Sequence, residues 1–207
     1  MAGCFITLEG GEGVGKSTQA RALAAALFDR GHDVLLTREP GGSDGAEAIR
    51  ALLLGGAVDR WSPASEALLF AAARADHVER TIRPALAEGR VVLCDRFVDS
   101  TMAYQGAAGG INAEALRQLH AIGSGGLMPD RTLVLLLPPE EGARRAAERD
   151  RDSGDRFARR DAGFHDRVAE AFAALTASEP ARVRGVDASG AVEEVTARLL
   201  AALEGLL

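Results

Sequence analysis

The segment from Gly10 to Ser17 has the residue types and spacing of a loop that binds the phosphates of a nucleotide. It reads G-x-x-x-x-G-K-S, follows the apolar run Cys4–Glu9 and precedes an Ala/Leu-rich helical pattern. Glycines let backbone N–H groups curl around phosphate oxygens, and the positive end of the following helix points at them. Lys16 is the only lysine in the chain. Its compact ammonium can reach between the β- and γ-phosphates, where a planar guanidinium is a poor replacement.

Ser17 and Asp95 complete the predicted donor side. Phosphoryl transfer depends on positioning, on a metal and on positive charge around the moving group. Ser17 carries the hydroxyl that would bind Mg²⁺, and Asp95, at the end of a strand-like run, would supply an acidic group near the metal. We therefore expect ATP as the phosphoryl donor and a metal site at Ser17 and Asp95.

Three arginines and one phenylalanine predict an acceptor side. Arg38 and Arg96 each end or follow a strand-like run, and two guanidinium forks can hold one phosphate dianion. Phe70 and Arg74 are four residues apart in a helical pattern, so they share a face that could stack on a nucleobase and bond to its carbonyl group. Taken singly, each arginine is typical of a surface and Phe70 of a core. Together, they predict a kinase of a small phosphorylated acceptor.

Five short apolar runs must position these residues. Helical patterns separate the runs, which predicts an α/β fold with a five-stranded, mostly parallel sheet flanked by helices. The ligand of such a sheet lies beyond the carboxyl ends of its strands, so residues 9–16, 38–42 and 95–96 should converge. The expected strands are Cys4–Glu9, Val34–Arg38, Val91–Asp95, Thr132–Leu137 and Val183–Asp187. The 207 residues are expected to form a single domain, 1–207.

Helices are predicted wherever apolar residues recur with helical spacing. The longest runs from Ala64 to about Ala87, with a break at Pro84. The others are Ser17–Arg30, Glu47–Leu54, Ala113–Ile122, Pro139–Arg149, Gly163–Ala177 and Ala191–Leu206. The segment from Arg149 to Asp161 is dense in charges instead. Alone, such a run is typical of a solvated loop, but beside a phosphate-binding loop its arginines suit a mobile lid that closes over a triphosphate.

Composition excludes several classes of protein. A net charge of −6 argues against a dedicated nucleic-acid or membrane-surface protein. No apolar run approaches the roughly 20 residues that span a bilayer, and the start does not resemble a signal peptide, so a cytoplasmic location is expected. Cys4 and Cys94 lie in strand-like runs and are expected to be reduced. A GTPase needs an Asn-Lys-x-Asp motif, which cannot exist here because the only lysine is Lys16.

Five segments in order along the chain resemble bacterial thymidylate kinases, a family of P-loop nucleoside monophosphate kinases. They are EGGEGVGKST (Glu9–Thr18), TREPGG (Thr37–Gly42), LLFAAAR with His77 (Leu68–Arg74), DRFVDSTMAYQG (Asp95–Gly106) and PDRTL (Pro129–Leu133). The phosphate-binding loop alone is common to many proteins, whereas TREPGG together with DRF and AYQG is much more specific. The resemblance implies transfer of the γ-phosphoryl group of ATP to dTMP in dTTP synthesis, a homodimer and small-molecule substrates.

The resemblance also implies a role for each matching residue. ATP would be bound by Arg145, stacked on adenine, and by Gly10, Gly11, Glu12, Gly13, Val14, Gly15, Lys16, Ser17 and Thr18. The phosphate of dTMP would be held by Arg38 and Arg96, and its sugar would meet Glu12 and Tyr104. The base would meet Phe70, Arg74, Thr101 and Gln105. The catalytic groups would be Lys16, Asp95, Arg96 and the lid arginines Arg149, Arg151 and Arg156.

Three positions depart from the family pattern. Gly109 lies where an arginine usually follows Gln-Gly, the strand around Leu136 lacks the usual aspartate, and Ala158 replaces a lid glutamate. These changes bear on lid closure and on contacts of the acceptor loop. Two alternative functions remain, a kinase of another monophosphate or small alcohol, and an ATP-dependent switch that signals through partners. The acceptor residues favour dTMP over both.

Overall fold

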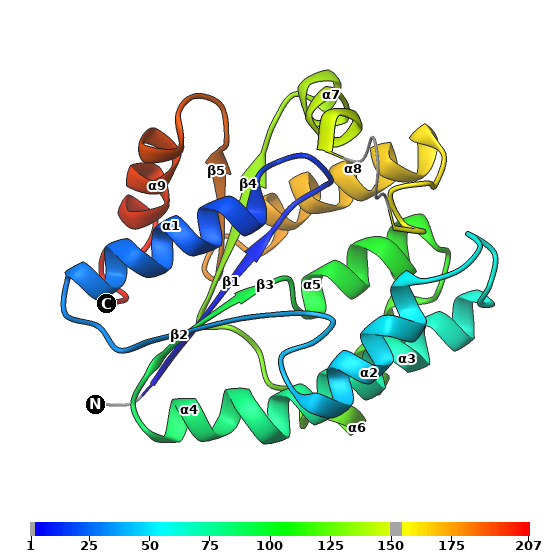
Figure 1. The fold of residues 1–207 in the computed structure, drawn as a ribbon, viewed down its shortest axis with the longest axis horizontal. Coiled ribbons are helices and arrows are strands. Elements are labelled where there is room, and N and C mark those ends of the chain that lie inside the picture. Colours follow the sequence, from blue (N-terminus) through cyan, green and yellow to red (C-terminus); the bar gives the residue numbers. More distant parts are fainter. Residues whose placement is uncertain (1–2, 150–154) are drawn as a thin grey trace.

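The computed structural model describes residues 3–149 and 155–207, which are arranged around one five-stranded sheet (Figure 1). Neighbouring strands are all parallel, in the order β2-β3-β1-β4-β5. The strands are β1 (Cys4–Glu9), β2 (Val34–Arg38), β3 (Val91–Asp95), β4 (Arg131–Leu136) and β5 (Val183–Asp187). The prediction of the sheet is confirmed, and only β4 differs, since it begins and ends one residue earlier than expected.

Helices cover both faces of the sheet (Figure 1). They are α1 (Lys16–Asp29), α2 (Asp44–Leu54), α3 (Pro63–His77), η1 (Val78–Ile82), α4 (Arg83–Ala87), α5 (Val98–Thr101), η2 (Met102–Ala108), α6 (Ala113–Ser124), α7 (Pro139–Arg149), α8 (Ala162–Ser178) and α9 (Val192–Ala201). One core layer packs α1 and α9 on the sheet through Leu23, Leu27 and Leu199. The other face is covered by η1, α4, η2 and α8.

The predicted long helix is present, but around Pro84 it consists of three consecutive helical segments, α3, η1 and α4. The π-helical turn η1 lies between α3 and α4, and Pro84 falls in the first turn of α4. Proline has no N–H group and its ring clashes with the carbonyl four residues earlier. The wider π turn accommodates that misfit, so the three segments follow one another without an intervening loop.

A helical segment that the sequence did not predict follows β3. It consists of α5 and η2, which together contain Thr101, Tyr104 and Gln105. The beginning of α5 is held by Glu9, whose Oε1 accepts from the backbone N–H of Phe97 at 2.7 Å and of Ser100 at 3.2 Å. The Glu9 side chain thus caps the first backbone N–H groups of this helix from β1.

The carboxyl ends of three strands converge as expected. In the register of the sheet, Asp95 lies beside Leu8 of β1 and beside Arg38 of β2. The loop after β1, the turn after β2 and the turn after β3 therefore meet at one edge of the sheet. In the part of the chain that the structure describes, no helix combines the length and apolar character needed to cross a membrane.

Candidate active site

The phosphate loop (Gly10–Ser17) connects β1 to α1 with the geometry of an anion cradle. Gly15 caps α1 in a left-handed conformation, with φ of 88°, which glycine adopts without steric cost. Lys16 is buried and donates from Nζ to the carbonyl of Gly11 at 2.6 Å. Burial and the nearby Arg96 charge lower the pKa of Lys16 to about 8. The ammonium is therefore held inside the loop, where the phosphates of a nucleotide would compete for it.

Gly13 brings the phosphate loop against α7. Its φ is 72°, and a Cβ atom on it would lie 2.0 Å from the carbonyl oxygen of Gly142. Only a residue without a side chain permits this approach. The first turn of α7 consequently lies directly on the loop, so that the position of α7 depends on Gly13.

Ser17 and Asp95 bring a hydroxyl and a carboxylate together beside the loop. The Ser17 hydroxyl donates to Asp95 Oδ2 at 2.7 Å, which places the end of β3 next to the start of α1. Magnesium prefers oxygen ligands and is usually held by one or two carboxylates together with phosphates and water. Among the described residues no group of three or more His, Cys, Asp or Glu side chains gathers. The Ser17–Asp95 pair therefore fits a magnesium ion that is bound with its nucleotide.

Arg96 is held from several sides in the turn after β3. Its φ of 71° is unusual for a residue with a side chain. Its Nη1 donates to the Gly10 carbonyl and to Ser100 Oγ, both at 3.2 Å, and its Nη2 donates to Glu12 Oε1 at 2.8 Å. The guanidinium also lies 5.0 Å from the ring centre of Tyr104. Burial opposes its charge, but Tyr104 and the neighbouring carboxylates keep the pKa of Arg96 above its ordinary value.

Glu12 is a shared acceptor for Arg96 and Tyr104. The Tyr104 hydroxyl donates to Glu12 Oε1 at 2.9 Å. The Tyr104 ring packs edge-on against Phe157, Phe164 and Phe172 in the core beneath α8. Burial raises the pKa of Tyr104 well above its ordinary value, so the phenol keeps its proton and acts as a donor.

A cavity of about 430 Å³ lies where these strand ends meet. It contains residues from both the predicted donor side and the predicted acceptor side. The predicted residues that line it are Glu12, Gly13, Gly15, Lys16, Ser17, Thr18, Arg38, Phe70, Arg74, Asp95, Arg96, Thr101, Tyr104 and Gln105. Among the predicted residues whose side chains the structure describes, Gly10, Gly11, Val14, Arg145 and Arg156 do not line it. The cavity thus joins a phosphate-binding end to an aromatic end.

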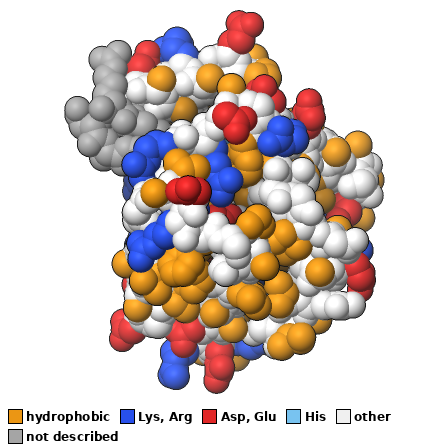
Figure 2. All heavy atoms as spheres, turned by 90° about the vertical axis from the view of Figure 1, so that its right-hand side faces the viewer, with side chains coloured by type: hydrophobic (Ala, Val, Ile, Leu, Met, Phe, Trp, Pro, Cys, Tyr) orange, Lys and Arg blue, Asp and Glu red, His pale blue; other side chains and the backbone are white. Residues whose placement is uncertain are grey.

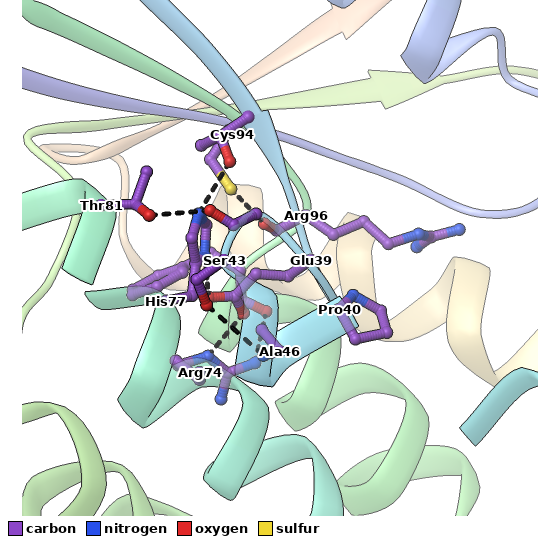
Figure 3. A network of polar contacts seen from close by, with 12 residues as sticks. Glu39, Pro40, Ser43, Ala46, Arg74, His77, Thr81, Cys94 and Arg96 are labelled. Carbon is purple, nitrogen blue, oxygen red and sulfur yellow. Dashed lines mark hydrogen bonds and ion pairs between the residues drawn. The ribbon is translucent and has the colours of Figure 1, made fainter. Parts of the chain in front are cut away.

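Arg74 is buried in a network at the aromatic end (Figure 3). Its Nε donates to Glu39 Oε2 at 2.7 Å, and its Nη2 donates to Thr101 Oγ1 at 2.8 Å and to the Phe97 carbonyl at 3.2 Å. His77 lies on the other side of the same carboxylate, with Nδ1 3.1 Å from Glu39 Oε1. Sequence reasoning assigned no role to Glu39, although the TREPGG segment contains it.

Gln105 meets a second buried carboxylate. Its Nε2 donates to Glu66 Oε1 at 2.8 Å. Glu66 lies on α3, one turn before Phe70, and was not singled out in the sequence because a glutamate in the first turn of a helix is common. The Phe70 ring is 5.7 Å from that of Phe157 and forms the apolar wall of the cavity.

Arg50 is a further cation in the cavity that sequence reasoning missed. It lies on α2 and donates from Nη1 to the Pro40 carbonyl at 2.6 Å, which ties α2 to the turn after β2. Arg38 lies nearby and donates to the exposed Glu47 at 2.8 Å. Burial and the Arg38 charge lower the pKa of Arg50. The sequence contained one signal for Arg50: it lies on the helix that directly follows TREPGG, so it could fold back onto that turn.

Arg156 does not lie where the lid prediction placed it. It is fully buried, and its Nε donates to the Leu53 carbonyl at 2.5 Å and its Nη1 to the Val58 carbonyl at 3.1 Å. Its Nη2 forms an ion pair with Glu66. With every guanidinium nitrogen bound to the α2–α3 region, Arg156 anchors the chain after the predicted lid. Arg156 is therefore not among the residues that line the cavity in this structure, and its predicted contact with phosphate stays a prediction.

The other arginines predicted to contact ATP are Arg145, on the helix before the lid, and the lid residues Arg149 and Arg151. Arg145 lies on α7 and donates to Glu141 Oε1 at 2.5 Å. Arg149 is the last residue of α7, and its side chain lies outside the described part of the structure. Arg151 also lies outside the described residues. For these three residues, the predicted contacts with ATP stay predictions.

A phosphate loop between the first strand and helix, facing arginines and an aromatic pocket across one cavity, defines a P-loop kinase of a small molecule. The family model for thymidylate kinase matches residues 8–199. The chain belongs to the thymidylate kinase family.

Known relatives agree with this assignment. The chain is 65% identical to a thymidylate kinase of Rhizorhabdus wittichii over 100% of both sequences. It is 52% identical to a thymidylate kinase of Caulobacter vibrioides over 95% of this chain and 94% of the relative. A crystal structure of thymidylate kinase from Ehrlichia chaffeensis superposes with a TM-score of 0.79 at 29% identity, covering 99% of this chain and 100% of that one.

Proposed function

We propose that this protein transfers the γ-phosphoryl group of ATP to dTMP, forming dTDP and ADP for dTTP synthesis. The observation that carries the proposal is the single cavity in which Lys16 and Ser17 face Arg96, Phe70 and Arg74. Membership of the thymidylate kinase family supports it. A phosphate-binding loop at one end and an arginine-lined aromatic pocket at the other fit one nucleotide donor and one nucleotide acceptor.

The donor half of the mechanism belongs to the phosphate loop. Backbone N–H groups of residues 10–18 would hold the ATP phosphates, and Lys16 would release the Gly11 carbonyl to bind them. Ser17 and Asp95 would hold Mg²⁺, which when bound neutralises charge on the phosphates. Arg145 would stack on adenine, and Arg149 and Arg151 would add positive charge from the lid. Such arginines contribute about 10³- to 10⁵-fold in related enzymes.

The acceptor half belongs to the strand-end arginines. Arg38 and Arg96 would hold the dTMP phosphate, with Arg50 as a third cation in the cavity. One oxygen of that phosphate attacks the γ-phosphorus of ATP, the bond to the bridging oxygen breaks, and ADP leaves with the electron pair. A phosphate dianion is already a nucleophile, so the residues supply alignment and charge neutralisation. Glu12 and Tyr104 would meet the sugar, with Tyr104 crowding the 2′ position.

The base would lie at the aromatic end of the cavity. Phe70 would stack on thymine, Arg74 would donate to its 4-carbonyl oxygen, and Thr101 and Gln105 would meet the rest of the pyrimidine edge. A charge-assisted hydrogen bond of this kind stabilises a complex by about 1.5–3 kcal/mol. A pocket for the 5-methyl group separates thymine from uracil by only about 1–3 kcal/mol.

We also propose that the protein is cytoplasmic and that it forms a homodimer through an exposed apolar surface. Leu52 on α2, Leu68 on α3 and Ile122 on α6 are exposed, the last by 84%. Hydrophobic side chains gather in the lower half of the face shown in Figure 2, on the side where α2 and α3 lie in Figure 1. Such a patch is typical of an association surface. Sedimentation should show a dimer at micromolar protein, and a monomer alone would reject the dimer.

One panel of substrates tests the proposed function. ATP and Mg²⁺ are supplied with dTMP, dUMP, UMP, dCMP or AMP, and the release of ADP is measured. We expect the highest kcat/KM with dTMP and a measurable but lower value with dUMP, by about 10- to 200-fold. Absence of a preference for dTMP would overturn the function. Hydrolysis of ATP that no acceptor accelerates would instead indicate an ATP-dependent switch.

A further inference from the structure

Glu39 is the ion-pair partner of Arg74 at the aromatic end of the cavity. Both side chains are buried, with exposed fractions of 5% and 3%, and Glu39 Oε2 accepts from Arg74 Nε at 2.7 Å. Figure 3 shows the carboxylate between Arg74 and His77. His77 Nδ1 lies 3.1 Å from Glu39 Oε1, and the other ring nitrogen of His77, Nε2, lies 2.7 Å from Thr37 Oγ1. Each oxygen of Glu39 thus has its own nitrogen partner, which fixes the rotation of the carboxylate.

The fixed carboxylate decides which nitrogen of Arg74 remains for a ligand. Nε is bound to Glu39, and Nη2 is bound to Thr101 Oγ1 and the Phe97 carbonyl. Nη1 donates to no other residue in the described part of the chain. Because Arg74 lines the cavity, Nη1 is the donor that this side chain retains for a bound molecule.

Glu66 fixes the orientation of Gln105 in the same way. Glu66 is ion-paired with Arg156 and Arg160 through Oε2, and its Oε1 accepts from the amide nitrogen of Gln105 at 2.8 Å. The amide oxygen of Gln105, Oε1, therefore points away from Glu66. No residue among those described donates to it. Gln105 is 2% exposed and lines the cavity, so Oε1 is the acceptor that it retains for a ligand.

The two retained groups have opposite polarity, and both belong to residues that line the aromatic end of the cavity. Arg74 is bound to Thr101, which precedes Gln105 by four residues on the same helical segment. A donor beside an acceptor matches the edge of thymine, which has a carbonyl oxygen at position 4 and an N–H group at position 3. Cytosine has an amine and an unprotonated nitrogen at these positions, so both contacts would be mismatched. Uracil has the same edge as thymine.

We propose that Glu39 and Glu66 are specificity-determining positioning residues, which select a 4-oxo pyrimidine monophosphate over a 4-amino one by fixing the outward groups of Arg74 and Gln105. Neither carboxylate needs to touch the base. The inference rests on the proposed function, because that function places the base at Arg74 and Gln105. A site whose hydrogen-bonding groups are fixed and buried rejects a mismatched ligand much more strongly than a flexible one.

The variant Glu66→Gln tests the second half of this proposal. Arg156 and Arg160 would hold the oxygen of the new amide at position 66, so its nitrogen would face Gln105. Gln105 would then turn its own oxygen toward position 66 and present its amide nitrogen, a donor, to the cavity. We expect the ratio of kcat/KM for dTMP to that for dCMP to fall by about tenfold or more. The ratio of dTMP to dUMP should stay within about twofold, because both bases present the same edge.

Arg160→Ala is the matched control for Glu66→Gln. Arg160 Nη2 is 3.3 Å from Glu66 Oε2, the oxygen that does not face Gln105. Its removal weakens the surroundings of Glu66 while the contact with Gln105 remains. Both substrate ratios should therefore stay at their wild-type values, and a fall in the dTMP to dCMP ratio here would contradict the proposal.

Glu39→Gln tests the first half independently, and it covers the case in which Glu66→Gln does not fold. Arg74 would lose its ionic partner and rotate more freely, so the ratio of dTMP to dCMP should again fall by about tenfold. The KM for ATP should not change, because Glu39 lies at the aromatic end of the cavity. Titration calorimetry with dTMP and dCMP in the absence of ATP should show the same change in the ratio of Kd values.

The outcomes separate the inference from the function on which it rests. Equal use of all monophosphates by the wild-type protein would overturn the proposed function. A wild-type preference for dTMP, combined with a parallel loss for dTMP, dUMP and dCMP in both glutamine variants, would show that the carboxylates serve folding alone and would overturn the inference. A fall in the dTMP to dCMP ratio of kcat/KM in the glutamine variants, with the dTMP to dUMP ratio unchanged, supports the inference.

Discussion

Arg96 donates to the carboxylate of Glu12 over 2.8 Å, and this ion pair joins two loops that are 84 residues apart in the sequence. Both side chains are mostly buried, with exposed fractions of 19% and 17%. Glu12 also accepts from Tyr104 at 2.9 Å. The phosphate loop and the turn after β3 therefore hold the guanidinium in place, with the positive φ of Arg96 as part of that arrangement.

Arg96→Lys should impair the use of dTMP more than the use of ATP. A lysine has one compact donor group and cannot reach Gly10, Ser100 and Glu12 together, so at least one charge-assisted bond is lost. We expect kcat/KM for dTMP to fall by about 10- to 100-fold. Arg90→Lys, where the arginine pairs with exposed Asp33, is the control. Steady-state kinetics with each substrate varied measures the effect, and equal losses in the two variants would contradict it.

Gly13→Ala should damage the contact between the phosphate loop and α7. The new Cβ would lie 2.0 Å from the Gly142 carbonyl, at a φ of 72° that alanine adopts only with strain. We expect kcat/KM for ATP to fall by about 10- to 100-fold, together with a lower Tm. At Gly11 an added Cβ would meet nothing within 4 Å. Gly11→Ala should therefore have the smaller effect, and the reverse order would show that the Gly13–Gly142 contact is unimportant.

Binding of ATP above neutral pH should be accompanied by uptake of a proton at Lys16. Burial and Arg96 lower the pKa of Lys16 to about 8, so at pH 8.5 roughly three-quarters of the free protein has a neutral lysine. Phosphates in the loop favour the charged form, so uptake should approach three-quarters of a proton at pH 8.5 and roughly one-tenth at pH 7. The affinity for ATP should accordingly weaken as pH rises through 8.

Calorimetry in buffers of different ionisation enthalpy measures this uptake. Lys16→Arg is the control, because a guanidinium stays protonated throughout this range. Its binding of ATP, although weaker, should show no uptake that depends on pH between 7 and 8.5. The same uptake in both proteins would assign the proton to another group.

Local patterns were sufficient to predict the sheet and the phosphate loop. Each strand is a short apolar run, and the loop is defined by glycine spacing, so neither depends on distant residues. The rule that parallel strands end at a common edge also predicted that Ser17 and Asp95 would meet, and the hydroxyl lies 2.7 Å from the carboxylate. These features follow from sequence because their physical causes lie within a few residues.

The features that sequence did not predict depend on long-range partners. The helix at Val98 begins without a local capping side chain, because Glu9 from another strand accepts from its first backbone N–H groups. The position of Arg156 is decided by carbonyl groups of Leu53 and Val58, about one hundred residues away. A charge run shows that arginines are present, but it does not show which of them a distant carboxylate will bury.

Arg156→Met should reduce stability, in contrast to the effect expected of a lid arginine. The substitution removes the ion-pair partner of Glu66 and the donors to the carbonyls of Leu53 and Val58. Breaking a buried ion pair of this kind destabilises by about 3–5 kcal/mol. Urea unfolding should show a clearly lower midpoint. Arg159→Met removes an exposed arginine three residues away, and it should change the free energy of unfolding by only about 0.5 kcal/mol. Normal stability combined with a large loss of kcat in Arg156→Met would restore Arg156 to the lid.

Glu9 should make the stability of the protein depend on pH. Burial, followed by the charge of Asp99, raises the pKa of Glu9 from 4.5 to about 8. Between these values the folded protein keeps a proton that the unfolded chain has lost, so the free energy of unfolding should decrease as pH rises from about 5 to 8. Glu9→Gln removes this titration and can still accept from Phe97 and donate to Ser100.

The difference in stability between Glu9→Gln and the wild-type protein isolates this contribution, because all other titrating groups are common to both. Urea unfolding at pH 5, 6, 7 and 8 should show the variant gaining on the wild-type protein at each step, with the gain ending near pH 8, where the carboxyl is charged in both states. A constant difference across this range would mean that Glu9 is ionised in the folded protein throughout. The Ser100 hydroxyl would then donate to an ionised Glu9 carboxylate over the 2.6 Å to Oε2.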